Sequence, residues 1–254
     1  MNVLTHALDR TVVIRATPET VFRFFTDSAR WAAWWGAGST IDAKPGGAVR
    51  IRYPDATEAS GDVLEIAAPE RLVFTYGYAS GSPIPPGGSR VTIQLEPHEE
   101  GTLLRLTHEF ADPAVRDQHV QGWRYQLSVF SNIVANEVTA GAADAIDRWF
   151  DAWAIPDDRE REQTLAGIAA ANVRLRDRFS AVDGIAELVP HLAAAQRFMP
   201  GLRLRRSGGV RQCQGMAVAD WVATGPDGAQ RASGTSVFVF DPAGRFASVT
   251  GFWN

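Results

Sequence analysis

Apolar and polar residues alternate along most of residues 49–110, which is the period of a half-buried β-strand. Turn-forming residues such as Pro45-Gly46-Gly47 and Ala68-Pro69-Glu70 separate the alternating runs. The apolar or aromatic positions of the runs are Val49, Ile51, Tyr53, Leu64, Ile66, Leu72, Phe74, Tyr76, Tyr78, Val91, Ile93, Leu95, Leu104, Leu106, His108 and Phe110. Together with the β-branched run Thr11–Ala16, the pattern predicts a curved antiparallel meander of about six strands.

Two segments of the first half carry a helical pattern instead. Thr17, Pro18 and Glu19 supply an N-cap, a proline at the first helical position and an early acid for the first helix. The second begins near Asp112-Pro113, and its apolar residues are Val120, Trp123, Leu127, Phe130 and Val134. Their spacing places them on one helix face about four turns long, which can close the open side of the sheet.

The second half has a different order of elements. Ile146, Trp149, Phe150 and Trp153 form the apolar face of one predicted helix, and Leu165 and Ile168 mark another. We then expect an alternating strand over 173–179, a helix over 184–199, and four strands near 202–206, 216–223, 231–240 and 245–253. The boundary near Ala140-Gly141-Ala142 is short, so two domains are predicted, residues 1–140 and 141–254, without a long flexible linker.

The motifs of the first half resemble those of a known family. They are Ala16–Phe22, Trp34, Pro45-Gly46-Gly47, Ala68–Phe74 and Gly122-Trp123, and they span roughly residues 8–138. Their order is similar to that in the START-like (SRPBCC) superfamily, and closest to the branch of homologues of the heat-shock-protein-90 ATPase activator. The resemblance implies a helix-grip fold, in which a curved sheet wraps a long helix around an apolar cavity. Members include polyketide cyclases, lipid carriers and resistance proteins, so the fold does not determine the function.

The second half resembles the SnoaL-like members of the nuclear-transport-factor-2-like (cystatin-like) cone. The supporting residues are Arg148-Trp149, Ala152-Trp153, Asp157, Asp177-Arg178-Phe179, Gly184, Pro200-Gly201, Trp221 and Gly251-Phe252-Trp253. The fold class predicted for the whole chain is therefore α+β, a helix-grip domain followed by a cone domain. Cone domains often pair through their sheets, so the resemblance implies a homodimer through the second domain, which sedimentation would test.

Composition and charge narrow the function classes. The chain has 254 residues, of which 45% are hydrophobic and 21% charged, with a mean hydropathy of -0.13, typical of a soluble globular protein. No apolar run reaches the roughly 20 residues of a membrane span, and the start lacks a basic segment followed by an apolar one, so a cytoplasmic protein is expected, without a membrane partner. The net charge of -4 disfavours nucleic acid as a partner. A single cysteine, Cys213, excludes an internal disulfide.

Three residues of the second half are candidates for acid–base chemistry. Strand parity places Asp177 on the face of Val173, Leu175 and Phe179, where a desolvated carboxylate can act as a general base. Asp177 can instead end the strand and cap the turn that follows.

Asp220 and His191 are the other two candidates. Asp220 shares a face with Met216, Val218 and Val222, and it faces the cavity if Trp221 packs on the outside. His191 lies at the edge of an apolar helix stripe, where it can pair with a carboxylate or remain a surface histidine. No metal-binding or cofactor motif accompanies these residues, so neither a metal nor a cofactor is expected.

Aromatic residues of both halves are candidates to line a ligand cavity or to form ordinary core. Apart from His108 and Leu127, all the candidate lining residues are aromatic. They are Trp34, Trp35, Tyr53, Phe74, Tyr76, Tyr78, His108, Trp123, Leu127 and Phe130, with Trp149, Trp153 and Trp221 in the second half.

Three functions follow as hypotheses. The first is non-covalent binding of a small hydrophobic or polyketide-like aromatic ligand, for transport, sequestration or resistance. The second is a cofactor-free cyclase, isomerase or hydratase that uses the cone cavity. The third, a chaperone accessory role, rests on the family's name alone.

Overall fold

A computed structural model describes residues 3–254. The chain divides into two compact units, Met1–Ala135 and Asn136–Asn254. Each unit combines helices with one sheet, which makes the fold class α+β as predicted. Within the described residues, no helix is both long enough and apolar enough to cross a membrane.

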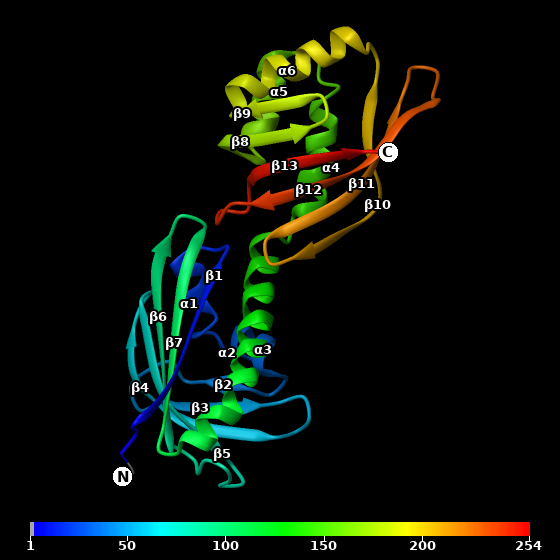
Figure 1. Cartoon of the computed structure of the whole chain (residues 1–254). Helices are drawn as coiled ribbons and strands as arrows, with labels where there is room; N and C mark the ends of the chain where they lie inside the picture. The colour runs from blue at the N-terminus through cyan, green and yellow to red at the C-terminus, as the bar shows by residue number, and fades with distance from the viewer. Residues whose placement is uncertain (1–2) are drawn as a thin grey trace. The chain divides into compact units, whose positions relative to one another are not determined.

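The first unit is built on a seven-stranded antiparallel sheet with the order β1-β7-β6-β5-β4-β3-β2 (Figure 1). Its strands are β1 (His6–Ile14), β2 (Thr40–Ile41), β3 (Ala48–Arg52), β4 (Glu58–Ala67), β5 (Arg71–Tyr78), β6 (Ser89–His98) and β7 (Gly101–Phe110). The predicted meander is confirmed, and the two-residue strand β2 was not foreseen. The first strand also begins earlier than its β-branched residues indicate, because His6–Arg10 pair with β7.

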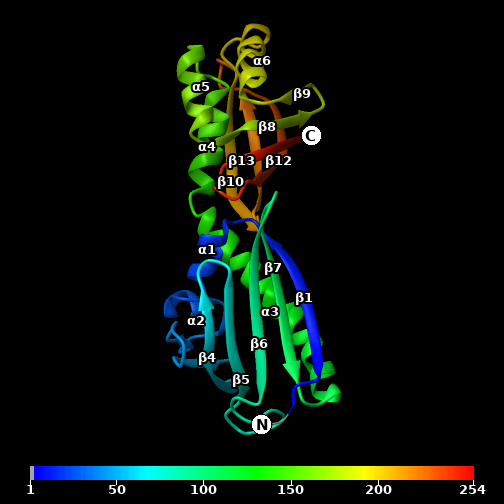
Figure 2. The ribbon, with the colours of Figure 1, turned by 90° about the vertical axis from the view of Figure 1, so that its left-hand side faces the viewer.

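Three helices begin in the first unit: α1 (Pro18–Arg23), α2 (Ser28–Trp35) and α3 (Pro113–Val138), of which only the last three residues fall in the second unit. The predicted N-cap is confirmed, because the Thr17 hydroxyl accepts a hydrogen bond from the Thr20 amide at 3.3 Å. In α3 the predicted face is buried at Trp123, Leu127, Phe130 and Val134. Figures 1 and 2 both show α3 lying along one face of the sheet, with α1 and α2 on that same side.

Aromatic side chains fill the core between this sheet and its helices. Phe25 of the segment after α1 stacks on Phe130 of α3, with ring centroids 5.1 Å apart. Trp31 of α2 meets Phe74 of β5 edge to face at 5.8 Å. These four side chains are all at most 1% exposed, so they form the closed, dry part of the unit.

The second unit contains a six-stranded sheet with the order β10-β11-β12-β13-β8-β9, in which only β13 and β8 run parallel. Its elements are α4 (Ala142–Ala152), α5 (Asp158–Ala166), β8 (Ala169–Asp177), β9 (Ser180–Asp183), α6 (Ile185–Phe198), β10 (Arg203–Cys213), β11 (Met216–Thr224), β12 (Gln230–Phe240) and β13 (Phe246–Trp253). Figure 2 shows α4 and α5 together on one side of this sheet. The predicted order of helices and strands is confirmed, with β9 as an addition.

The strand predicted over 173–179 ends two residues early. Asp177 is the last residue of β8, and its carboxylate accepts a hydrogen bond from the Phe179 amide at 2.7 Å, which forms a tight turn into β9. The Phe179 side chain is 68% exposed, so it does not share a buried face with Val173 and Leu175 as strand parity predicts. The hydrogen bond from the Phe179 amide to the Asp177 side chain ends the strand, so the alternation of buried and exposed residues does not continue to Phe179.

Candidate functional site

The first unit contains a cavity of about 940 Å³ that is open to solvent. Its walls come from α2, the segment after β3, β5 and its following loop, β7 and α3. The predicted ligand-binding residues that border it are Trp34, Trp35, Tyr53, Tyr76, Tyr78, His108 and Trp123. The volume lies within the range of about 300–1,000 Å³ that small-molecule sites occupy.

Three predicted lining residues, Phe74, Leu127 and Phe130, do not border this cavity. Phe74 shares the sheet face of Tyr76 and Tyr78, but Trp31 covers it. Leu127 and Phe130 continue the α3 face of Trp123 into the closed core. Side-chain period predicts the face of an element correctly, but it does not predict how deep along that face a residue lies.

The three tryptophans of α2 have unequal hydrogen bonding. Spacing of three and four residues places Trp31, Trp34 and Trp35 on one side of the helix. The Trp31 indole N–H donates to the Arg50 carbonyl at 3.2 Å. The indole nitrogens of Trp34 and Trp35 are buried and have no hydrogen-bond partner among the described residues.

Two buried phenols meet inside the cavity. The hydroxyl oxygens of Tyr53 and Tyr76 lie 2.9 Å apart, within hydrogen-bond distance. Burial raises the pKa of both phenols above their ordinary value, so both stay neutral at physiological pH. Because they are neutral, they add hydrogen-bonding groups to the cavity wall without adding charge.

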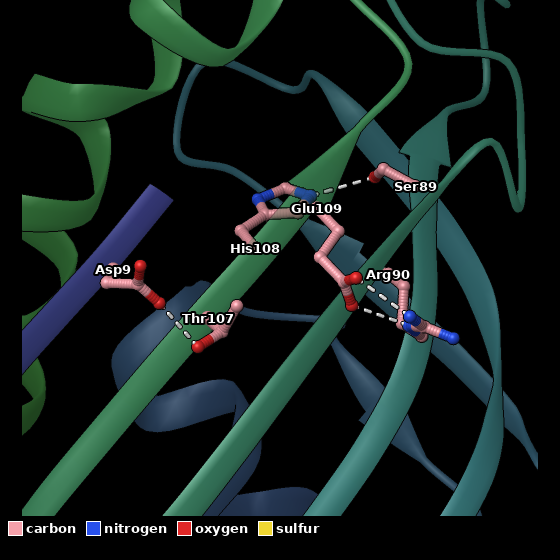
Figure 3. Close-up of polar contacts among 6 residues, drawn as sticks. All are labelled: Asp9, Ser89, Arg90, Thr107, His108 and Glu109. Atoms are coloured by element: carbon pink, nitrogen blue, oxygen red, sulfur yellow. Dashed lines mark hydrogen bonds and ion pairs between the residues drawn. The ribbon is translucent and has the colours of Figure 1, made fainter. Parts of the chain in front are cut away.

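His108 is held by a chain of hydrogen bonds. The Trp123 indole, which can only donate, donates to Nδ1 of His108 at 2.9 Å. The proton of the neutral imidazole therefore lies on Nε2, which is 2.8 Å from the Ser89 hydroxyl (Figure 3). That hydroxyl donates in turn to the Tyr76 carbonyl at 2.8 Å. Both ring nitrogens are thus occupied.

This chain of bonds makes His108 a structural residue. Its side chain has no exposed surface, and burial, with a smaller contribution from nearby His119, lowers its pKa well below the ordinary value. A proton added at Nδ1 would break the bond from Trp123. His108 therefore borders the cavity as a neutral support for Trp123 and has no free lone pair for a base.

The neighbours of His108 on β7 point to the opposite face of the sheet, as strand alternation requires. Thr107 donates to the Asp9 carboxylate at 2.6 Å, and Glu109 accepts two hydrogen bonds from Arg90 at 2.6 and 2.8 Å (Figure 3). The Arg90 guanidinium lowers the pKa of Glu109. These contacts are exposed and contribute little to stability.

His119 of α3 borders the same cavity and was not among the predicted residues. Its Nδ1 lies 2.8 Å from the Val115 carbonyl, so Nδ1 carries the proton, and its Nε2 lies 3.2 Å from the Tyr78 hydroxyl, which can donate to it. Burial lowers the pKa of His119, while the bond to Val115 opposes that shift. Its position four residues before Trp123 on α3 is the sequence signal that could have identified it.

The second unit has its own cavity of about 720 Å³. Trp149, Trp153, Trp221, Asp177 and His191 all border it, so five of the predicted residues of the second half come together. Three alanines also line it: Ala194, Ala195 and Ala232. The exposed Phe179 and Phe198 lie among its lining residues as well.

The two predicted acid–base residues that line the second cavity, Asp177 and His191, are already engaged in local bonds. The Asp177 carboxylate accepts from the Phe179 amide, as the turn-capping alternative predicts. Nε2 of His191 lies 2.9 Å from the Ser180 hydroxyl. Among the described contacts there is no hydrogen bond between Asp177 and His191, so the two do not form a dyad in this structure.

Asp220 does not line the cavity, which corrects the prediction. In β11 the buried residues are Ala217, Ala219, Trp221 and Ala223, while Asp220 lies on the exposed face and accepts from the Thr235 hydroxyl at 2.6 Å. Trp221 therefore faces inward and Asp220 outward. The inner positions are mainly alanine while Met216, Val218 and Val222 are larger, which is why the sequence left the buried face of this strand open.

No group of three or more metal-ligating side chains is found within residues 3–254. Comparison with known proteins gives one family match: residues 15–135 match the model described as activator of Hsp90 ATPase homolog 1-like protein. This match confirms the resemblance inferred from the motifs of the first half. No curated protein matches the chain.

Several solved structures are each similar to about half of the chain. A SnoaL-like family protein from Agrobacterium tumefaciens is 25% identical over 44% of this chain and 95% of its own, with a TM-score of 0.42. The Aha1 dimer from Colwellia psychrerythraea is 17% identical over 48% of this chain and 91% of its own, with a TM-score of 0.42. Protein MLL2253 from Mesorhizobium loti is 20% identical over 50% of this chain and 94% of its own, with a TM-score of 0.45.

Proposed function

We propose that the first unit, whose residues 15–135 match the family of activator of Hsp90 ATPase homolog 1-like proteins, binds a small aromatic molecule without covalent chemistry. The observation that carries the proposal is the aromatic cavity of about 940 Å³. Its wall includes Trp34, Trp35, Tyr53, Tyr76 and Trp123, whose rings offer a large contact area at little cost in conformational entropy. Transport or sequestration of such a compound is the role that this site fits.

The hydrogen bonding of the cavity supports binding over catalysis. His108 has both nitrogens engaged, and the raised pKa values of Tyr53 and Tyr76 keep both phenols protonated, so neither supplies a phenolate that could act as a base. His119 keeps one imidazole nitrogen that accepts from Tyr78. The wall is thus better arranged to hold a ligand than to exchange protons with it.

Native mass spectrometry of the full chain tests the proposal. The protein is incubated with a panel of aromatic hydrocarbons, phenols and ketones of two to four rings, and tryptophan fluorescence is titrated in parallel. We expect retention of one ligand in the first unit, with quenching of the cavity tryptophans. If no member of the panel is retained and none quenches the fluorescence, the proposal is wrong.

A second candidate function is acid–base catalysis in the second unit, favoured by the convergence of Asp177 and His191 on one cavity. If it operates, the protein should catalyse exchange of the α-hydrogens of an enolisable aromatic ketone with deuterium from water. Asp177→Asn should then slow exchange at least about 100-fold, which is the lower end of the usual effect of about 100- to 10,000-fold for a lost general base. The Asn side chain can still accept from the Phe179 amide, so folding should persist.

Asp220→Asn is the matched control for that experiment, because Asp220 lies on the exposed face of the same unit. Exchange is measured by mass spectrometry, and folding by thermal melting. Equal exchange rates in the Asp177 variant and the unaltered protein would remove Asp177 from any mechanism. Dimer formation through the second unit stays a prediction from the resemblance.

A further inference from the structure

The hydrogen-bond donors and the charges of the first cavity restrict what it can hold. We propose that its ligand is an uncharged aromatic molecule that carries an acceptor oxygen, such as a ring carbonyl. This inference rests on the proposed binding function and specifies the class of ligand. Two independent features carry it: unpaired indole donors in the wall, and the absence of a cation among the described lining residues.

The first feature is the unequal pairing of the tryptophans of the first unit. Trp31 donates to the Arg50 carbonyl and Trp123 to His108, so both indole N–H groups are satisfied. Trp34 and Trp35 are 3% and 4% exposed, and their indole nitrogens are buried without a partner. Both of these tryptophans line the cavity.

An indole N–H can donate but cannot accept, so it is satisfied only by an acceptor. Burying such a donor without an acceptor is unfavourable, and natural structures rarely leave one unpaired. A ligand oxygen that reaches Trp34 or Trp35 would supply the acceptor that the protein does not. A pure hydrocarbon of the same shape would leave these donors unpaired and gain nothing from them.

The second feature is the charge of the cavity. Among the residues that the structure describes around it, none is lysine or arginine, and the only carboxylate is the exposed Asp55. Hydrogen bonds from Thr57 lower the pKa of Asp55, so the rim carries a negative charge. Burial lowers the pKa of His108 and His119, which leaves both neutral at physiological pH.

This distribution of charge disfavours an anionic ligand. A carboxylate that enters the cavity would lose its hydration without meeting a counterion, and Asp55 would repel it at the rim. A cationic ligand would be attracted by Asp55 and the aromatic rings, but it offers no acceptor to Trp34 and Trp35. An uncharged molecule with a carbonyl oxygen fits both features.

Four tricyclic probes of nearly equal shape separate these classes. They are fluorenone, which carries one carbonyl, the hydrocarbon fluorene, a fluorenone carboxylate and the cationic aminomethylfluorene. Dissociation constants are measured on the full chain at neutral pH by calorimetry. We expect fluorenone to bind at least about fivefold more tightly than fluorene, the effect of one net hydrogen bond of about 1 kcal/mol, and at least about tenfold more tightly than the carboxylate or the cation.

A spectroscopic measurement locates the hydrogen bond. The carbonyl stretch of bound fluorenone should move to lower frequency than in an apolar solvent, because the indole N–H donates to it. Trp35→Phe keeps an aromatic wall but removes one donor, so the preference for fluorenone over fluorene should fall and the frequency shift should shrink. If Trp35→Phe does not fold, Trp34→Phe, which removes the other unpaired indole donor, is measured in its place, because the wall phenols can also lower the carbonyl frequency.

The outcomes separate this inference from the proposed function. Equal affinities for fluorene and fluorenone without a frequency shift would overturn the inference and leave the binding function standing. Tightest binding of the carboxylate or of the cation would overturn the inference as well. No binding of any of the four probes, or of the wider aromatic panel, would overturn both.

Discussion

Replacing Gly122 by phenylalanine is expected to weaken ligand binding at least about 100-fold, which corresponds to about 2.7 kcal/mol. Gly122 lies on α3 and borders the first cavity, and a Cβ atom added there would have no other atom within 4 Å. Gly122 is exposed where it borders the cavity, so a phenyl ring at this position would obstruct the opening through which the ligand enters. Calorimetry with the aromatic ligand found in the panel measures the loss.

Gly122→Ala is the matched control for this variant. It adds only one methyl group, so affinity should change little, while stability should rise by about 0.5–1 kcal/mol because glycine disfavours a helix interior. Gly122→Phe should remain folded, since its Cβ meets open space. Unchanged affinity in the folded phenylalanine variant would show that the ligand binds elsewhere in the chain.

Replacing His108 by leucine is expected to lower the free energy of unfolding of the first unit by about 2–3 kcal/mol at about pH 8. Leucine is apolar and cannot accept from Trp123, so the indole N–H loses its acceptor inside the protein. Ser89 loses the Nε2–H donor at the same time. Hydrogen–deuterium exchange of peptides from β5 to β7 measures the stability of this unit within the full chain.

The same variant should reveal the titration of His108. Because its pKa in the folded protein lies below the ordinary value of 6.5, the unfolded chain binds the proton more readily than the folded protein does. The contribution of His108 to the free energy of unfolding of the unaltered protein should be at its maximum above pH 6.5. Below pH 6.5 this free energy should fall by up to about 1.4 kcal/mol per pH unit. The leucine variant lacks this loss, so the gap between the two proteins should narrow in acid.

Thr107→Val is the control for the leucine variant. Thr107 is the adjacent residue of β7, and it bonds to Asp9 on the opposite, exposed face. Its replacement should change the free energy of unfolding by no more than about 0.5 kcal/mol. If the leucine variant is as stable as the unaltered protein, or if the gap between them does not change with pH, the hydrogen-bonded role assigned to His108 is wrong.

Much of the fold could be predicted because local signals and packing agree. The capping residue Thr17 lies where the sequence places a helix start, and its side chain accepts from the backbone of the first turn. The face of α3 follows from spacing alone, since Trp123, Leu127 and Phe130 are all buried. Repeated alternation with clear turns was enough to predict the antiparallel sheet of the first unit.

The candidate sites were harder to predict, for two physical reasons. The spacing of apolar residues identifies which face of a strand is buried, but not how deep each residue lies in the core. Tyr76 therefore borders the cavity, while Phe74, two residues away on the same face of β5, is covered by Trp31. Hydrophobicity also fails to identify the buried face of a strand when the residues on that face are small. In β11 the buried residues are mostly alanine, and Asp220 lies on the exposed face. His119 was missed because the apolar face of α3 was taken to begin at Val120, although His119 lies four residues before Trp123 on the same helix.

The alanines that line the second cavity have a consequence for how its selectivity can evolve. Ala194 and Ala195 lie on α6 and Ala232 on β12, and all three are half-buried beside the hollow. Valine or leucine at any of them would add bulk at the wall, but Ala195 and Ala232 also pack against the buried core, whereas Ala194 is not among the residues packed on it. A descendant of this protein could therefore accept shorter compounds through a single point mutation, with Ala194 as the position that disturbs the core least.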